Sequence, residues 1–128
     1  MKILVDTHAL IWWLQGKNLL SGTARALIEE PRTEKYASAV STWEIVTKSR
    51  LGKLAFDLSH GVSLTKVFRS NGFLDLPLGL EHGEMAGNLV GPHKDPFDRM
   101  LAAQSLIEDM PLVTVDAVFG QFGVHCIW

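Results

Sequence analysis

Short apolar runs rich in β-branched residues alternate with helix-like segments along this chain of 128 residues. Such alternation predicts a parallel sheet, because parallel neighbours need long crossover connections, which helices provide with a right-handed turn. The predicted strands cover residues 2–6, 36–40, 73–78, 111–115 and 124–128. The predicted helices cover residues 7–14, 21–31, 41–50, 64–72, 80–89 and 96–110. We therefore expect an α/β fold with a parallel sheet.

Length and composition narrow the class of protein. A chain of 128 residues with 47% hydrophobic residues suits a single domain, here residues 1–128. Cys126 is the only cysteine, which excludes an internal disulfide and a cysteine zinc site and favours a reduced, cytoplasmic setting. Asp6 and His8 interrupt the apolar start, so it does not resemble a signal peptide. We expect no membrane span, and the net charge of −2 gives no strongly basic footprint for nucleic acid.

Four acids stand where a predicted strand passes into a helix or where a helix begins. They are Asp6, Glu44, Asp98 and Asp116. In a parallel sheet the carboxyl ends of the strands share one rim with the amino ends of the following helices, and ligands bind there. Carboxylates gathered on one rim repel one another unless a cation lies between them, and a hard divalent ion prefers oxygen ligands. The pattern predicts a metal site suited to phosphate chemistry.

Each acid also has a purely structural explanation. Asp6 is well placed to cap the helix that follows, and Glu44 could form a capping box with Ser41. Asp98 falls at the third helical position, where the helix dipole favours an acid, and Asp116 could cap a short turn. Capping explains each acid singly, but not why all four should meet on one rim.

The segment around Asp98 contains more polar groups than a helix start requires. Asp95 is a good N-cap and Pro96 suits the first turn. His93 could orient Asp95 or face solvent. Arg99 could contact a phosphate or pair with a nearby acid, and the sequence leaves both interpretations open.

Four segments make the chain resemble the PIN-domain ribonucleases, and most closely the toxin component of VapBC toxin–antitoxin pairs. The segments are residues 3–7 (ILVDT), 41–45 (STWEI), 95–104 (DPFDRMLAAQ) and 112–116 (LVTVD). The resemblance implies a three-layer α/β/α sandwich and a Mg²⁺- or Mn²⁺-dependent endoribonuclease. It also implies that Asp6, Glu44, Asp98 and Asp116 are the catalytic metal ligands, and that a small VapB-like antitoxin is the partner.

The resemblance extends to polar residues beside the acids. Thr7 and Thr114 match polar positions near the family's site, whereas His8 stands where many members have Asn. Because histidine can still donate a hydrogen bond, this departure affects only a contact beside the ligands.

Cations and tryptophans near the expected site have two interpretations each. The cations could follow an RNA backbone or form a solvated helix face. The tryptophans could stack on bases or pack in the core or between two copies of a homodimer. These residues are Lys48, Arg50, Lys53, Trp12, Trp13 and Trp43.

Other functions remain open on the sequence alone. A non-catalytic RNA- or protein-interaction module could use the same scaffold, although it would not need four acids together. A housekeeping RNA-processing nuclease would have the same acids as a toxin. Phosphoryl-transfer domains of the haloacid dehalogenase type place a second Asp two positions after the first, where this chain has His8. Receiver domains need adjacent acids after the first strand, which are absent.

Overall fold

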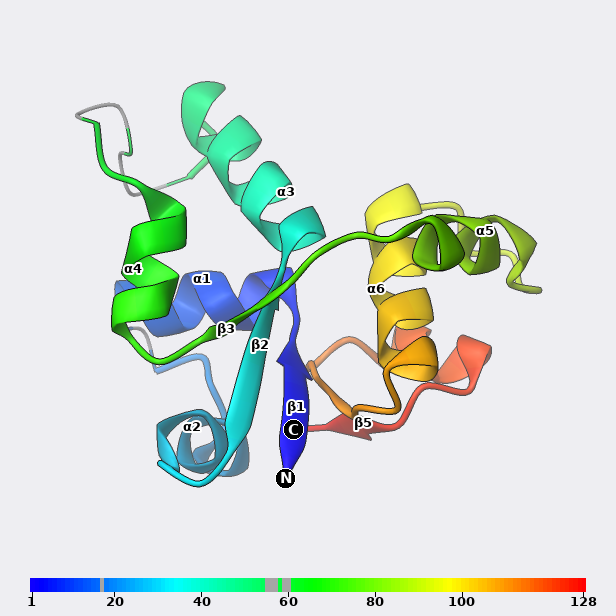
Figure 1. Cartoon of the computed structure of the whole chain (residues 1–128), viewed down its shortest axis with the longest axis horizontal. Coiled ribbons are helices and arrows are strands. Elements are labelled where there is room, and N and C mark those ends of the chain that lie inside the picture. Colours follow the sequence, from blue (N-terminus) through cyan, green and yellow to red (C-terminus); the bar gives the residue numbers. More distant parts are fainter. Residues whose placement is uncertain (17, 55–57, 59–60) are drawn as a thin grey trace.

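The described residues form a central sheet of five parallel strands, in the spatial order β3-β2-β1-β4-β5 (Figure 1). The structure, a computed structural model, describes residues 1–16, 18–54, 58 and 61–128. The strands are β1 (Lys2–Val5), β2 (Glu34–Ser38), β3 (Leu74–Leu76), β4 (Leu112–Val113) and β5 (Cys126–Ile127). The parallel α/β prediction is confirmed, although every strand except β2 is shorter than expected.

Helices cover both faces of the sheet, which confirms the three-layer arrangement. They are α1 (Thr7–Gln15), α2 (Gly22–Glu29), α3 (Ala39–Arg50), α4 (Leu64–Ser70), α5 (Leu80–Asn88), α6 (Pro96–Ile107) and the 3₁₀ helix η1 (Ala117–Phe122). Figure 1 shows α1, α2 and α4 on one side of the sheet, with α5, α6 and η1 on the other. None of the helices in the described part of the chain combines the length and apolar character needed to cross a bilayer.

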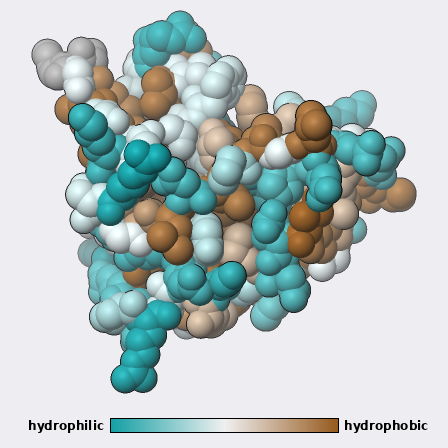
Figure 2. All heavy atoms as spheres, viewed as in Figure 1, coloured by the Kyte–Doolittle hydropathy of each residue, from teal (hydrophilic) through white to brown (hydrophobic). Residues whose placement is uncertain are grey.

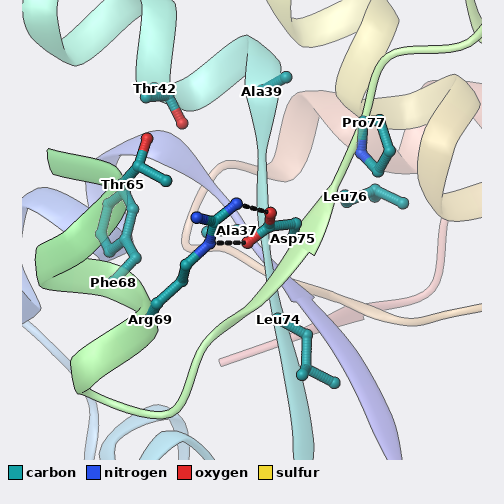
Figure 3. A pocket seen from close by; sticks show the side chains of 10 residues that line it. All are labelled: Ala37, Ala39, Thr42, Thr65, Phe68, Arg69, Leu74, Asp75, Leu76 and Pro77. Atoms are coloured by element: carbon teal, nitrogen blue, oxygen red, sulfur yellow. Dashed lines mark hydrogen bonds and ion pairs between the residues drawn. The ribbon is translucent and has the colours of Figure 1, made fainter.

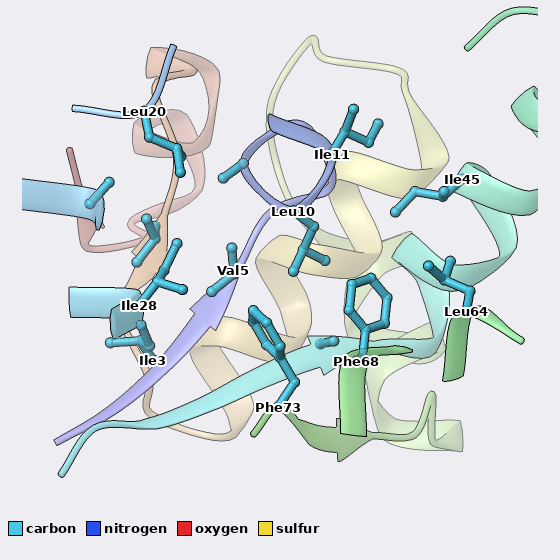
Figure 4. Packing of buried hydrophobic residues seen from close by; sticks show 14 residues of the cluster. Ile3, Val5, Leu10, Ile11, Leu20, Ile28, Ile45, Leu64, Phe68 and Phe73 are labelled. Carbon is cyan, nitrogen blue, oxygen red and sulfur yellow. The ribbon is translucent and has the colours of Figure 1, made fainter. Parts of the chain in front are cut away.

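Alternation along β1 divides the core into two clusters. Ile3 and Val5 are fully buried among side chains of α1, α2 and α4, whereas Leu4 is fully buried against α6 and η1. Figure 4 shows the first cluster, in which Leu10 and Phe68 converge on the sheet beside Phe73. Because β1 is apolar on both faces, it can occupy only the middle of the sheet.

The order of the strands creates a switch point beside β1. The chain moves outward from β1 to β2 and β3, then crosses back so that β4 pairs with the other edge of β1. Ligands of open α/β sheets bind in the crevice at the carboxyl ends of the strands at such a point. Asp6 directly follows β1 and Thr114 directly follows β4, so both are delivered to this crevice.

The start of α3 differs from the prediction. The helix begins at Ala39, because the Ser38 hydroxyl accepts a hydrogen bond from the amide of Val40 at 3.0 Å. Ser41 is therefore buried inside the helix and cannot be its N-cap, so the capping box with Glu44 is wrong. Glu44 has no capping role, which removes the structural explanation offered for it.

The buried face of α6 agrees with the predicted one only in part. Helical spacing predicts that Met100, Ala103, Ile107 and Met110 point inward. Ala103 and Met110 are buried, but Met100 and Ile107 are only partly buried, and Leu101 and Ala102 are fully buried beside Ala103. Arg99 and Asp98 occupy the side of the first turn that faces the rim and α5. Packing against two neighbours, the sheet and α5, sets this orientation.

The surface shows no single dominant apolar face in the view of Figure 2, where hydrophobic and hydrophilic side chains are interspersed. Leu80 and Val90 are the most exposed large apolar side chains of the described residues, at 95% and 89%. They lie at the start of α5 and just beyond its end.

Candidate functional site

All four predicted acids line one small polar cavity at the carboxyl end of the sheet. The cavity has a volume of about 100 Å³. Its walls are Asp6, Thr7, His8, Glu44, Lys48, Asp95, Asp98, Leu101, Asp116 and Phe119. Five carboxylates and one lysine ammonium thus share a space little larger than a few water molecules.

Asp6 lies deepest, with only 4% of its surface exposed. One carboxylate oxygen, Oδ1, accepts a hydrogen bond from the amide of Ala9 at 2.8 Å and so caps α1. The other, Oδ2, accepts from the hydroxyl of Thr114. The pKa of Asp6 is raised to about 6, chiefly because the carboxyl group is buried. The hydrogen bonds from Thr114 and Ala9 and the charge of His8 lower this pKa, whereas the charge of Asp98 raises it. Asp6 therefore caps α1 with a carboxylate whose ionised form is disfavoured by burial.

Asp98 stands in the first turn of α6, opened by the N-cap Asp95 as the sequence predicted. His93 binds it directly, with 2.7 Å between His93 Nε2 and Asp98 Oδ2, so His93 neither orients Asp95 nor simply faces solvent. Burial raises the pKa of Asp98, the hydrogen bond from His93 lowers it, and the charges of Asp95 and Asp116 raise it. The carboxylates of Asp95 and Asp116 thus disfavour the charged form of Asp98.

Glu44 reaches the cavity from the middle of α3, not from its first residues. Its Oε2 accepts a hydrogen bond from Lys48 Nζ at 2.6 Å, one helical turn further on. Thr7 binds Ser41 through their hydroxyls at 2.9 Å, which joins the start of α1 to α3. This buried bond fixes the side of the cavity between Asp6 and Glu44.

Asp116 is exposed at the cavity mouth and caps η1 through the amide of Val118, as the sequence suggested for a short turn. The amide of Asp116 donates to the Thr114 hydroxyl at 3.0 Å, and that hydroxyl donates to Asp6. Thr114 thus links the backbone at one acid to the carboxylate of another.

Arg99 binds backbone carbonyl oxygens, a role that the sequence did not suggest, and its contact with a phosphate stays a prediction. Its guanidinium donates to the backbone carbonyl oxygens of Ala86 and His93, each at 2.9 Å, and to that of Leu89. The side chain therefore holds the end of α5 and the following loop against α6. Sequence reasoning missed this role because carbonyl acceptors of a loop leave no trace in residue types.

Each of the tryptophans Trp12, Trp13 and Trp43 makes a packing contact, and Trp12 also lines a groove. Trp12 and Trp13 are half-buried against the first core cluster, and Trp13 meets Phe73 edge to face at 5.2 Å between ring centroids. Trp43 is 57% exposed on α3, where its ring lies 5.1 Å from that of Phe97 in α6. Core packing is thus confirmed for Trp12 and Trp13.

The carboxylate oxygens of the cavity suit a hard divalent cation, but the described side chains are not arranged as a complete metal cage. No three His, Cys, Asp or Glu side chains in the described part of the chain stand together as a ready metal cage. Lys48 and His93 instead occupy the carboxylates of Glu44 and Asp98. Mg²⁺ retains several waters and binds through one or two carboxylates, so a full protein cage is not required. A buried carboxylate with a raised pKa, repelled by its neighbours, fits such a cation.

A second cavity, of about 300 Å³, lies away from the acids between α3, α4 and β3 (Figure 3). Its polar wall is an exposed ion pair in which Arg69 binds both carboxylate oxygens of Asp75. The two charges satisfy each other, and most of the remaining lining is apolar. This cavity therefore offers less chemistry than the acidic one.

Fold and site together define an open parallel α/β domain with an acidic cavity at its switch point. The family model of the PIN domain matches residues 3–124, and the chain belongs to the PIN-domain family. No individual curated protein sequence matches the chain.

Solved structures with the same fold cover essentially the whole chain. One is a chain of VapBC2 from Rickettsia felis, in a complex bound to a DNA fragment from its promoter. Its TM-score is 0.69 at 12% sequence identity, and the match covers 100% of this chain and 99% of that chain. A chain of FitAB bound to the IR36 DNA fragment has a TM-score of 0.62 at 17% identity, covering 99% and 94%. FitAcB from Neisseria gonorrhoeae gives 0.59 at 15%, covering 100% and 97%. At these identities the likeness establishes the fold alone.

Proposed function

We propose that the protein is a divalent-metal-dependent endoribonuclease that hydrolyses RNA phosphodiester bonds, and that it is the toxin of a toxin–antitoxin pair. One observation supports this most strongly: acids from four separate elements of a PIN fold line one polar cavity. Capping can explain Asp6, Asp98 and Asp116 one by one, but it gives no reason for Glu44 to join them.

Asp6 and Asp98 are the proposed direct ligands of Mg²⁺ or Mn²⁺, with Glu44 and Asp116 acting through water or at a second ion. A divalent ion, if held by these carboxylates, would supply the Lewis acidity that hydrolysis of a phosphodiester requires. Thr114 binds one carboxylate oxygen of Asp6, and His93 binds one carboxylate oxygen of Asp98. These hydrogen bonds hold each carboxylate in a fixed orientation. Thr7 supports the same wall through Ser41.

The toxin role rests on the resemblance of the sequence to VapBC toxins and on the fold shared with chains of VapBC2 and FitAB. We propose a small VapB-like antitoxin as the partner, and a homodimer as the assembled form.

Cleavage of a mixed pool of small RNAs tests the nuclease proposal. Purified protein is incubated with Mg²⁺ or Mn²⁺, or with EDTA, beside the variants Asp6→Asn and Asp98→Asn. Asp75→Asn is the matched control, because Asp75 is an exposed acid next to the other cavity. We expect metal-dependent cutting that both site variants lose by at least about 100-fold, with Asp75→Asn active. Cutting that persists in EDTA or in Asp6→Asn would refute the proposal.

A further inference from the structure

A groove beside the acidic cavity has a different chemical character. Its volume is about 410 Å³, within the usual range for small-ligand sites. It is lined by His8, Ile11, Trp12, Gln15, Lys48, Lys53 and Leu54. The described lining thus contains two lysines, two aromatic rings and an amide, but no carboxylate.

The groove and the acidic cavity share two wall residues. His8 and Lys48 line both spaces, one from the first turn of α1 and the other from α3. A chain molecule lying across these two residues would therefore have one unit beside the carboxylates and the next in the groove.

Its aromatic wall offers a stacking surface. The rings of His8 and Trp12 are stacked, with centroids 5.9 Å apart and planes 30° from parallel. Trp12 is held in place by Trp128, whose ring meets it edge-on at 5.8 Å. His8 is exposed, so a planar group can reach this pair without unfolding the core.

We propose that this groove binds one unpaired nucleotide of the RNA strand, next to the phosphate held at the acidic cavity. The base stacks on the His8–Trp12 pair, and Lys53 with Lys48 receives the adjoining phosphate. This inference rests on the proposed nuclease function and adds a nucleotide subsite beside its cavity.

Binding without cleavage tests the groove separately. Fluorescence anisotropy would measure the dissociation constant of a labelled oligouridylate of about ten nucleotides. The measurement uses the Asp6→Asn protein in EDTA, with Trp12→Leu, His8→Ala and Lys53→Gln added in turn. Lys66→Gln is the matched control, since Lys66 is an exposed lysine on α4, outside both spaces.

We expect Trp12→Leu to weaken binding by about five-fold or more, the effect of losing one base–aromatic stack. Lys53→Gln should lower the slope of log affinity against log salt by about 0.7, the value for one phosphate contact on a single strand. Lys66→Gln should alter neither quantity. Should Trp12→Leu lose its thermal transition, His8→Ala and Lys53→Gln decide the matter.

Binding that is absent, or equal in Lys53→Gln, His8→Ala and Lys66→Gln, would overturn the groove proposal. Cleavage that fails while these binding changes occur would overturn the nuclease proposal instead. Intact cleavage with unchanged binding would overturn the groove alone.

Discussion

Asp6 is subject to two opposing effects: hydrogen bonds stabilise its carboxylate, and burial destabilises it. The residue must cap α1 and accept from Thr114, yet it is 4% exposed and lies near other carboxylates. Its ionised form is costly in the folded protein, which is why its pKa rises from 3.8 to about 6. A cation would relieve that cost, so metal binding and stability are coupled at this residue.

The pH dependence of stability should show this cost. Between pH 3.8 and about 6 the folded protein keeps a proton on Asp6 that the unfolded chain has lost. The free energy of unfolding should therefore fall as pH rises through that window, by on the order of 3 kcal/mol from this group. In EDTA, Asp6→Asn should remove this fall and be more stable than wild type at pH 7, as measured by urea denaturation.

Asp75→Asn is the control, because the pKa of Asp75 is shifted in the direction opposite to that of Asp6. Arg69 lowers the pKa of Asp75, so its contribution is present above the unfolded value and lost as pH falls below it. The variant should leave the fall between pH 4 and 6 intact. A wild-type curve that is flat there, or an Asp6→Asn protein less stable at pH 7, would contradict the burial argument.

At the scale of elements, α6 is the component that assembles the rim. Its N-cap Asp95 fixes where the helix starts, and Asp98 is thereby placed in the first turn. Arg99, next along the same helix, binds three carbonyl oxygens of α5 and the following loop, including that of His93. Since His93 binds Asp98, Arg99 positions the acid indirectly.

Arg99→Met should loosen this assembly. Three carbonyl oxygens would lose a charged donor, and we expect a loss of about 3 kcal/mol in the free energy of unfolding. RNA cleavage should fall further than global unfolding explains, because His93 loses its anchor. Arg99→Lys should recover only part, as one ammonium cannot reproduce the planar fork. If Arg99→Met keeps wild-type stability and activity, the positioning role is wrong.

The elements also show where sequence reasoning ends. The N-cap Asp95 and the end of α4 at Asn71-Gly72 were predictable because the local chemistry is unambiguous. Ser38 and Ser41 are equally good caps on paper, and the choice of Ser38 follows from packing. Ser41 is buried against Thr7, and Ser38 also donates to the buried Gln104 at 2.6 Å. Such long-range contacts leave no local pattern.

Across the whole molecule, the sheet order explains why separate acids meet. β1 lies between β2 and β4, so the residues after β1 and β4 emerge side by side, and α6 returns its first turn to the same rim. The alternation of elements predicted this convergence. The sequence could not predict the partners inside the cavity, Lys48 on Glu44 and His93 on Asp98, because side-chain geometry decides them.

Calorimetric titration with Mn²⁺ at pH 7.5, above the raised pKa of Asp6, tests the central claim most directly. We expect saturable binding by wild type and by Asp75→Asn, lost in Asp6→Asn and Asp98→Asn. Binding should also weaken as pH falls through 6, because protons then compete for Asp6. Absence of binding by the wild type, or binding that survives both site substitutions, would contradict a metal centre formed by these acids.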